Sequence, residues 1–248
     1  SAVAVAAALG AEVCEIYTDV DGIYTADPRD VIKAKKILKI TYEEILEMSS
    51  SGSKVLHPRS VELAMKYGIK IPVRSSFKEQ IGTFVIKEEE SMEKEVVTGI
   101  SSSDEEAKIT LIGIHDTPGV ASKIFNPLAE ANVNVDMIVQ NITDDGKLTS
   151  LTFTVSNSEC KKAVSALKQS KIKFGKIHID EMICKVSIIG VGMKSHVGVA
   201  KTMFESLAKV NINIQVISTS EIKISVLISK DKKKQALLAL HKSYGLEK

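Results

Sequence analysis

The feature that most constrains this sequence is an internal duplication in its second half. Residues 108–113 (KITLIG) match residues 185–190 (KVSIIG) further along the chain. After a two-residue insertion, further positions recur: Gly119, Val120, Ala121, Phe125, Leu128, Ala129, Asn132 and Asn134 return as Gly198, Val199, Ala200, Phe204, Leu207, Ala208, Asn211 and Asn213. Repetition of this kind predicts two units that share one fold.

Each copy predicts a strand, a glycine-containing loop, an amphipathic helix, an Asn-rich turn, two strands and a second helix. This order is typical of the α+β ferredoxin-like fold, βαββαβ. The first copy, over residues 107–180, supplies its own fourth strand at 173–179, whereas the second, over 181–248, ends at a helix. The segment 95–100 (EVVTGI) has strand composition, so we expect it to complete the second copy. The second copy is then split into 95–106 and 181–248, with the first copy inserted between.

Residues 1–86 predict a different unit, because helices and short buried strands alternate as in layered α/β folds. Thr41 precedes Glu44 by three residues and predicts a capping box at a helix start. The predicted helices cover residues 2–11, 41–48 and 59–67, and the predicted strands cover 12–18, 69–73 and 84–86. The charged run over 87–94 lacks apolar periodicity and is expected to be a solvated linker.

Composition excludes several classes of protein. The 33 Lys+Arg residues nearly balance 31 Asp+Glu, and only 4% of residues are aromatic, so nothing indicates nucleic-acid binding. The apolar run 2–11 is too short to span a bilayer, and no membrane association is expected. The three cysteines, Cys14, Cys160 and Cys184, lack disulfide or zinc-site spacing, which fits a reducing cytoplasm.

Two loops of the first unit carry groups suited to anion binding. The stretch 18–29 (TDVDGIYTADPR) follows a strand of an α/β unit, where ligands commonly bind, although a satisfied Asx-turn loop explains it equally well. Every arginine of the chain precedes the linker, and a guanidinium suits phosphate. In 51–59 (SGSKVLHPR), Lys54 could reach phosphate oxygens, but no P-loop is present. His57 is expected to be structural.

Together, TDVDGIYTADPR and SGSKVLHPRSVELA resemble the C-terminal half of the catalytic domain of aspartokinases, enzymes of the amino-acid-kinase family that phosphorylate aspartate. The repeats, with DTPGVASKIF, NVDMIVQN, GMKSHVGVAKTMF and NIQVISTSEIKISVLI in family order, resemble their paired ACT domains. The resemblance implies a partial amino-acid-kinase αβα sandwich followed by two ACT domains. It also implies conversion of L-aspartate to 4-phospho-L-aspartate in lysine, threonine and methionine biosynthesis, with feedback inhibition.

The resemblance places nucleotide contacts at Thr18, Asp19, Tyr24, Arg29 and Lys54. It implies ATP as a substrate with Mg²⁺, without a prosthetic group or a metal site assigned to particular residues. The family's glycine-rich segment, catalytic residues and aspartate-binding residues are expected upstream of Ser1. We therefore expect the 248 residues alone to lack kinase activity, since phosphoryl transfer depends on positioning and charge neutralisation by the complete site.

The resemblance also places amino-acid effector contacts in the repeats. They fall at Asp116, Gly119, Ala121, Asp136 and Gln140 of the first copy, with Val199, Asn213, Ile214 and Ser220 of the second copy facing them across a dimer. Lysine is the expected effector, with threonine second, because Ala200 stands where threonine-responsive relatives often carry threonine. From the residues alone, Asp116 could equally cap a helix and Asp136 could equally be a solvated edge residue.

Two alternatives remain. The chain could represent a non-catalytic ACT regulatory subunit that starts internally at Met92 and binds lysine or threonine. It would then act as a homodimer or in a hetero-oligomer with a full-length catalytic subunit. Another amino-acid kinase, such as glutamate 5-kinase, shares a similar TADPR-like loop, but the ACT duplication argues against it.

Overall fold

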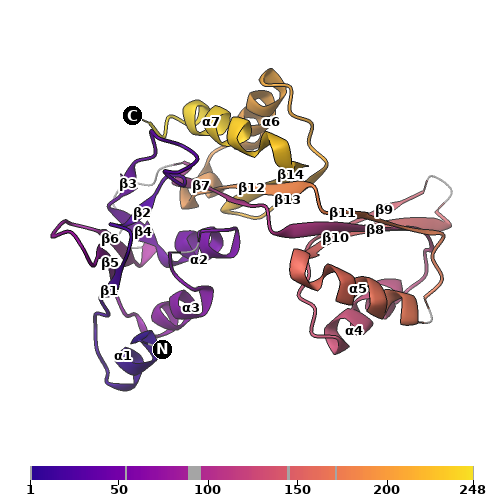
Figure 1. The fold of residues 1–248 in the computed structure, drawn as a ribbon, viewed down its shortest axis with the longest axis horizontal. Helices are drawn as coiled ribbons and strands as arrows, with labels where there is room; N and C mark the ends of the chain where they lie inside the picture. The colour runs from indigo at the N-terminus through magenta and orange to yellow at the C-terminus, as the bar shows by residue number, and fades with distance from the viewer. Residues whose placement is uncertain (1, 54, 89–95, 144–145, 171, 248) are drawn as a thin grey trace.

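The computed structural model describes residues 2–53, 55–88, 96–143, 146–170 and 172–247. These residues form three units, each built on a four-stranded sheet, with a small hairpin beside the first (Figure 1). This arrangement confirms the predicted fold class, an α/β segment followed by two ferredoxin-like copies. The expected linker lies largely among residues that the structure does not describe.

The N-terminal unit comprises α1 (Ala2–Ala8), β1 (Ile16–Thr18), β2 (Ile23–Tyr24), β3 (Lys36–Ile37), β4 (Lys39–Thr41), α2 (Tyr42–Ser50), α3 (Pro58–Tyr67), β5 (Ile71–Ser75) and β6 (Thr83–Ile86). Its sheet has the order β1-β5-β6-β4, in which β1 and β5 are parallel, as are β4 and β6. Buried Thr83 ties the β2–β3 hairpin to β6, because its hydroxyl accepts from the Ile23 amide at 2.7 Å and donates to the Ile37 carbonyl at 2.6 Å.

Local sequence explains the ends of the helices in this unit. The capping box is confirmed: the Glu44 amide donates to the Thr41 hydroxyl, and the Glu44 carboxylate accepts from the Thr41 amide. Gly68 ends α3 in the left-handed conformation, with φ of 68°. The following strand starts later than the predicted 69–73, because the Ile69 amide still donates to the Ala64 carbonyl of that helix end. The predicted strand over 12–18 narrows to β1.

The first copy comprises β8 (Glu106–His115), α4 (Val120–Glu130), β9 (Asp136–Ile142), β10 (Leu148–Ser156), α5 (Asn157–Gln169) and β11 (Lys176–Asp180). Its antiparallel sheet has the order β11-β8-β10-β9. Both helices cover one face of the sheet, where Ile109, Leu111 and Phe153 are buried beneath them. This is the βαββαβ topology that the sequence pattern predicts.

The second copy comprises β12 (Ile183–Ile189), the short 3₁₀ turn η2 (Val191–Ser195), α6 (Val199–Lys209), β13 (Val216–Thr219), β14 (Lys223–Ser229), η3 (Lys230–Lys232) and α7 (Lys233–Ser243). Its fourth strand is β7 (Gly99–Ser103), which pairs antiparallel with β12 in the order β13-β14-β12-β7. The strand thus comes from ahead of the first copy. It begins at Gly99, four residues later than the predicted segment.

Backbone conformation repeats along with sequence in the two copies. Gly119 precedes α4 with φ of 84°, and Gly198 precedes α6 with φ of 89°. Asn132 and Asn211, which follow these helices, both have positive φ, at 49° and 54°. Asparagine tolerates this region better than most residues, so the duplicated positions occupy duplicated turns.

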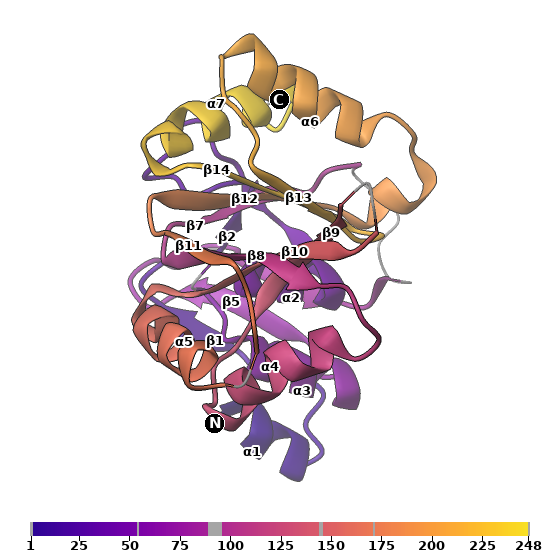
Figure 2. The same ribbon diagram turned by 90° about the vertical axis from the view of Figure 1, so that its right-hand side faces the viewer.

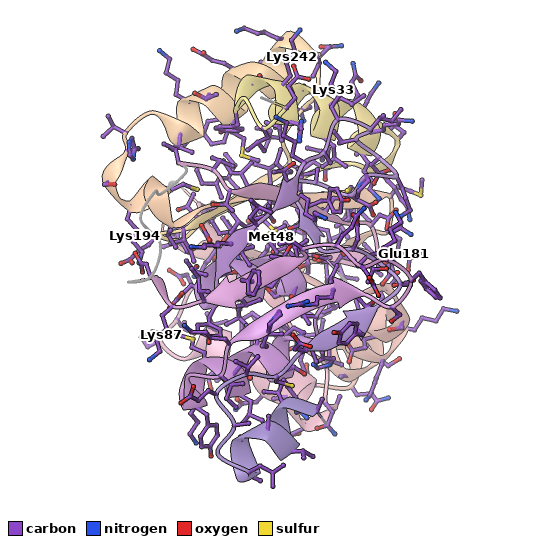
Figure 3. The ribbon with its side chains drawn as sticks, turned by 90° about the vertical axis from the view of Figure 1, so that its left-hand side faces the viewer. Lys33, Met48, Lys87, Glu181, Lys194 and Lys242 are labelled. Carbon is purple, nitrogen blue, oxygen red and sulfur yellow. The ribbon has the colours of Figure 1, made fainter. Side chains whose placement is uncertain are left out.

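The two copies lie with their helices on opposite sides and their sheets between the helix layers (Figure 2). Met137 of β9 packs with Ile183, Val216 and Leu227 of the second copy. The second copy also meets the N-terminal unit, since Ile189 belongs to that unit's core. Figure 3 shows Met48 of α2 near the middle of the molecule, while Lys33 and Lys242 lie together near α7.

Candidate functional site

The predicted nucleotide loop begins at the carboxyl end of β1. Thr18 and Asp19 are adjacent there, and the Thr18 hydroxyl donates to the Asp19 carboxylate at 3.1 Å. Tyr24 is half-buried, and its hydroxyl donates to Asp21 at 2.8 Å, which lowers the pKa of that carboxyl. The structure therefore brings Thr18 and Asp19 together and holds Tyr24 through Asp21.

Arg29 lies in the same loop and is highly exposed. Its guanidinium forms a two-pronged contact with Asp27, at 2.7 and 3.0 Å, and this carboxylate raises the pKa of Arg29. Its side chain is 89% exposed, so a phosphate could replace Asp27 without any burial of charge. Lys54, the fifth predicted nucleotide contact, lies outside the described residues.

The far end of this loop is anchored to the second copy, a connection that sequence analysis missed. Ala26 and Val31 are buried in the core of the second copy. The Thr25 hydroxyl lies 2.9 Å from Nε2 of His241 on α7, and Asp30 pairs with Lys233 at 3.2 Å. In the sequence, the apolar residues Val31 and Ala34 within an otherwise polar loop indicate that the loop packs against another unit.

A second connection runs through Glu44, which the sequence identified only as a helix cap. This carboxylate is 3% exposed. Its Oε1 atom accepts from the Thr98 hydroxyl at 2.6 Å and from the Val191 amide at 3.0 Å. Val191 begins the loop between β12 and α6. Glu44 therefore joins α2 directly to the loop that precedes the first helix of the second copy.

Four of the five predicted effector residues of the first copy gather at the carboxyl end of β8. Asp116 accepts from the Gln140 amide nitrogen at 3.4 Å, and Gly119 and Ala121 begin α4 close by. A Cβ built on Gly119 meets no atom within 4 Å, so the helix start faces open space. Free amides at a helix N-terminus favour a carboxylate, whereas Asp116 favours an ammonium group.

Asp136 lies elsewhere, at the opposite end of β9 from Gln140. Four strand residues span about 13 Å, so the two side chains do not share one pocket within the chain. The Asp136 carboxylate accepts from Lys185 at 2.8 Å. Although partial burial opposes ionisation, Lys185 holds the pKa of Asp136 below its usual value.

The predicted residues of the second copy do not face Asp116 within one chain. Asn213 and Ile214 adjoin Gln215, which contacts Lys108 in the first half of β8, whereas Asp116 follows the other end of that strand. Ser220 lies in the β13–β14 turn. The Val199 carbonyl is occupied by the Tyr244 hydroxyl at 2.7 Å. The predicted residues of the two copies therefore do not form one site within a single chain.

The described residues contain no cluster of three His, Cys, Asp or Glu side chains that could hold a metal ion. None of the described helices is long and apolar enough to cross a bilayer. The cysteines Cys14, Cys160 and Cys184 are buried as free thiols. Burial raises the pKa of the Cys184 thiol to about 12, so it stays protonated.

Comparisons with known proteins agree with this architecture. Residues 100–170 and 186–244 match the ACT domain family, and residues 1–75 match the amino acid kinase family. The chain is 53% identical to an aspartate kinase of Pseudomonas putida over 248 residues, covering 99% of this chain and 60% of that protein. It spans a similar share of the other curated relatives, including an aspartokinase of Helicobacter pylori at 51% identity.

Solved structures give the same result. Aspartokinase III of E. coli, in complex with aspartate and ADP, is 28% identical with a TM-score of 0.84, over 98% of this chain and 54% of that one. The regulatory subunit of aspartate kinase from Thermus thermophilus is 38% identical with a TM-score of 0.57, over 60% of this chain and 98% of that one.

Fold and comparisons together define a segment of an amino-acid-kinase domain followed by two ACT domains. The ACT match alone spans more than half of the chain. The chain belongs to the aspartokinase family, which confirms the resemblance carried by its motifs.

Proposed function

We propose that the chain is part of an aspartate kinase that transfers phosphate from ATP to the side-chain carboxylate of L-aspartate, giving 4-phospho-L-aspartate for lysine, threonine and methionine biosynthesis. The observation that carries this proposal is the loop 18–35, which bears four of the nucleotide candidates and continues into the core of the second ACT domain. The buried free thiols are consistent with a cytoplasmic enzyme.

In the proposed nucleotide site, Thr18 and Asp19 hydrogen-bond the nucleoside and Tyr24 packs against it. Arg29 exchanges Asp27 for a phosphate, since a guanidinium offers the same two-pronged geometry to either anion. Lys54 adds a second positive charge. Mg²⁺ would arrive with ATP and neutralise phosphate charge, as in phosphoryl transfer generally. The rest of the catalytic machinery is proposed to lie outside these 248 residues.

The proposed effector site lies between two chains. Asp116, Gly119, Ala121 and Gln140 of one chain would face Val199, Asn213, Ile214 and Ser220 of another. Asp136 belongs to the same predicted set. A ligand ammonium group that bound Asp136 would compete with Lys185 for its carboxylate. Lysine is the proposed effector, with threonine as the second candidate. Pairing through the ACT domains would give a homodimer, and an isologous contact completes both sites at once.

The domain division that we propose is 1–86 for the kinase segment, 87–94 for the linker, 107–180 for the first ACT domain, and 95–106 with 181–248 for the second. Strand β8 of the first domain begins one residue before that boundary, at Glu106. A second candidate function is a non-catalytic regulatory subunit paired with a full-length catalytic subunit. The similarity to the Thermus thermophilus regulatory subunit favours it. Its expected start, Met92, lies outside the described residues.

A coupled ADP-release assay tests the proposal. The longer protein of which we propose this chain to be a part should turn over ATP only when L-aspartate is present, and Arg29→Ala should weaken nucleotide binding without changing stability. Arg59→Ala, an exposed arginine on α3, is the matched control. Aspartate-independent ATP turnover, or equal nucleotide affinity in the Arg29→Ala and wild-type proteins, would refute the kinase proposal.

A further inference from the structure

A cavity of about 650 Å³ lies where α2 and the two ACT domains meet. Its wall includes Ser50 of α2, Ser103 of β7, Thr154 of β10, Asn157 of α5 and Lys185 of β12. The cavity opens where β8 begins, whereas the loop at Asp116 follows the end of that strand. Asp116 does not line the cavity, although Asp136 of the predicted effector set does.

Three buried oxygen atoms on this wall have no hydrogen-bond partner among the described residues: Oγ1 of Thr154, Oε2 of Glu106 and Oδ1 of Asn157. Thr154 is only 1% exposed. Native proteins leave few buried polar atoms unpaired, so three on one wall call for a common partner. Carboxylate and amide oxygens only accept hydrogen bonds. The missing partner must therefore donate several.

Lys185 shows that this wall stabilises an ammonium group. Its Nζ atom is 2.5 Å from Glu106 and 2.8 Å from Asp136. Burial opposes its charge, but the two carboxylates raise the pKa of Lys185 above the usual value. Lys185 uses Oε1 of Glu106, which leaves Oε2 of the same carboxylate for a second cation.

The other residues that line the cavity indicate which kind of ligand it could hold. Four carboxylates line the cavity, those of Glu105, Glu106, Asp136 and Glu159, against the two ammonium groups of Lys185 and Lys223. The volume is much larger than a bare metal ion needs, and a primary ammonium carries three donors.

We propose that this cavity binds a small organic cation whose primary ammonium donates to Thr154, Glu106 and Asn157. The ligand would touch α2 and both ACT domains at once. It would therefore stabilise their present arrangement, because a ligand that binds only the folded form favours it by mass action.

Calorimetric titration of the full 248-residue chain with 1,4-diaminobutane tests the proposal, with 1,4-butanediol as the uncharged control. The diamine should bind and the diol should not. Thr154→Val and Glu106→Gln should each weaken diamine binding about tenfold, since each removes a hydrogen bond to a charged group. Thr152→Val is the matched control: it lies on the same strand but pairs with Thr110 outside the cavity.

Asp116→Asn separates this cavity from the proposed effector site and should leave diamine affinity unchanged. Circular dichroism of each variant checks the fold. Absence of diamine binding, equal affinity in Thr154→Val and wild type, or loss of binding in Asp116→Asn would overturn the proposal. Competition by KCl at millimolar concentration, with no preference for the diamine, would also overturn it and assign the oxygens to an inorganic cation.

Discussion

The two ACT domains share a fold but differ in what the loop before their first helix contacts. In both domains the glycine before this helix, Gly119 or Gly198, faces open space. In the second domain, the equivalent loop carries the additional turn η2, and its Val191 amide donates to Glu44 of the kinase segment. A Cβ built on Gly190 would lie 2.5 Å from the Val96 carbonyl oxygen, which shows how closely this loop is packed.

The second loop is therefore committed to a contact with the kinase segment, and we propose that the first loop remains free to take a ligand. The committed loop lies beside α2, where Lys223 of β14 also pairs with Glu47 at 2.6 Å. Lys194 of η2 and Lys87 lie along one edge of the molecule (Figure 3), and Lys194 pairs with Glu88 at 3.5 Å.

The largest effect is expected from the buried charge between the two ACT domains. Lys185→Met should lower the free energy of unfolding by about 3–5 kcal/mol, because it leaves Glu106 and Asp136 without their cationic partner. Urea denaturation measures this. Lys201→Met, which breaks an exposed contact with Glu205, should change the free energy by no more than about 0.5 kcal/mol. Equal losses of unfolding free energy in the two variants would contradict the burial of Lys185.

Glu44→Ala tests the committed loop itself. It removes a helix cap and leaves the Val191 amide and Thr98 hydroxyl without their acceptor, so it should cost about 2–4 kcal/mol of unfolding free energy. The matched change in the free loop, Asp116→Ala, should cost at most about 1 kcal/mol. If thermal and urea unfolding show the two variants to be equally stable, the contrast between the loops is wrong.

Glycine substitutions sharpen the same contrast. Gly190→Ala should destabilise by about 1–3 kcal/mol, because the new methyl group meets the Val96 backbone. Gly113→Ala, at the position equivalent to Gly190 in the first domain, should cost about 1 kcal/mol, since its nearest atom lies 3.4 Å away but its backbone is left-handed. Differential scanning calorimetry compares the two variants, and a larger loss of stability at Gly113 would contradict the contrast between the loops.

The smallest effect concerns His241, which holds Thr25 of the nucleotide loop. Burial lowers the pKa of His241 below its usual 6.5, so the folded protein keeps it neutral while the unfolded chain takes up a proton. Stability from this group is complete above about pH 6.5 and is lost as the pH falls through the lower folded-state pKa. His241→Gln should reduce the pH dependence of the unfolding free energy between pH 7.5 and 5.5. The exposed His178→Gln variant should keep the wild-type slope.

Sequence predicted most of the fold because its signals are local or repeated. The capping box at Thr41, the glycine stops and the duplicated turns all depend on neighbouring residues. The strand needed by the second ACT domain was inferred from a missing edge, but its start was placed four residues early. Strand composition alone did not distinguish Glu95 from Gly99 as the first residue.

The candidate site was less predictable, since its important contacts join distant segments. Glu44 meets Val191, which lies 147 residues away, and Lys185 gave no sign within a strand pattern that it was buried with Glu106 and Asp136. The spacing of residues along one sequence does not show which distant segments come into contact in the fold. The groups at Asp116 and Gln140 were placed by family resemblance rather than by periodicity.

The most direct test of the account is calorimetric titration of the full chain with lysine, combined with sedimentation analysis of its assembly. We predict that lysine binds, that it shifts the chain toward a dimer because each site uses two chains, and that Asp116→Ala weakens binding about tenfold or more. Thr154→Val should leave the lysine-dependent shift toward a dimer unchanged. No binding of lysine or threonine to the wild type, or unaltered lysine affinity in Asp116→Ala, would contradict the central claim that the free loop of the first ACT domain is the effector site.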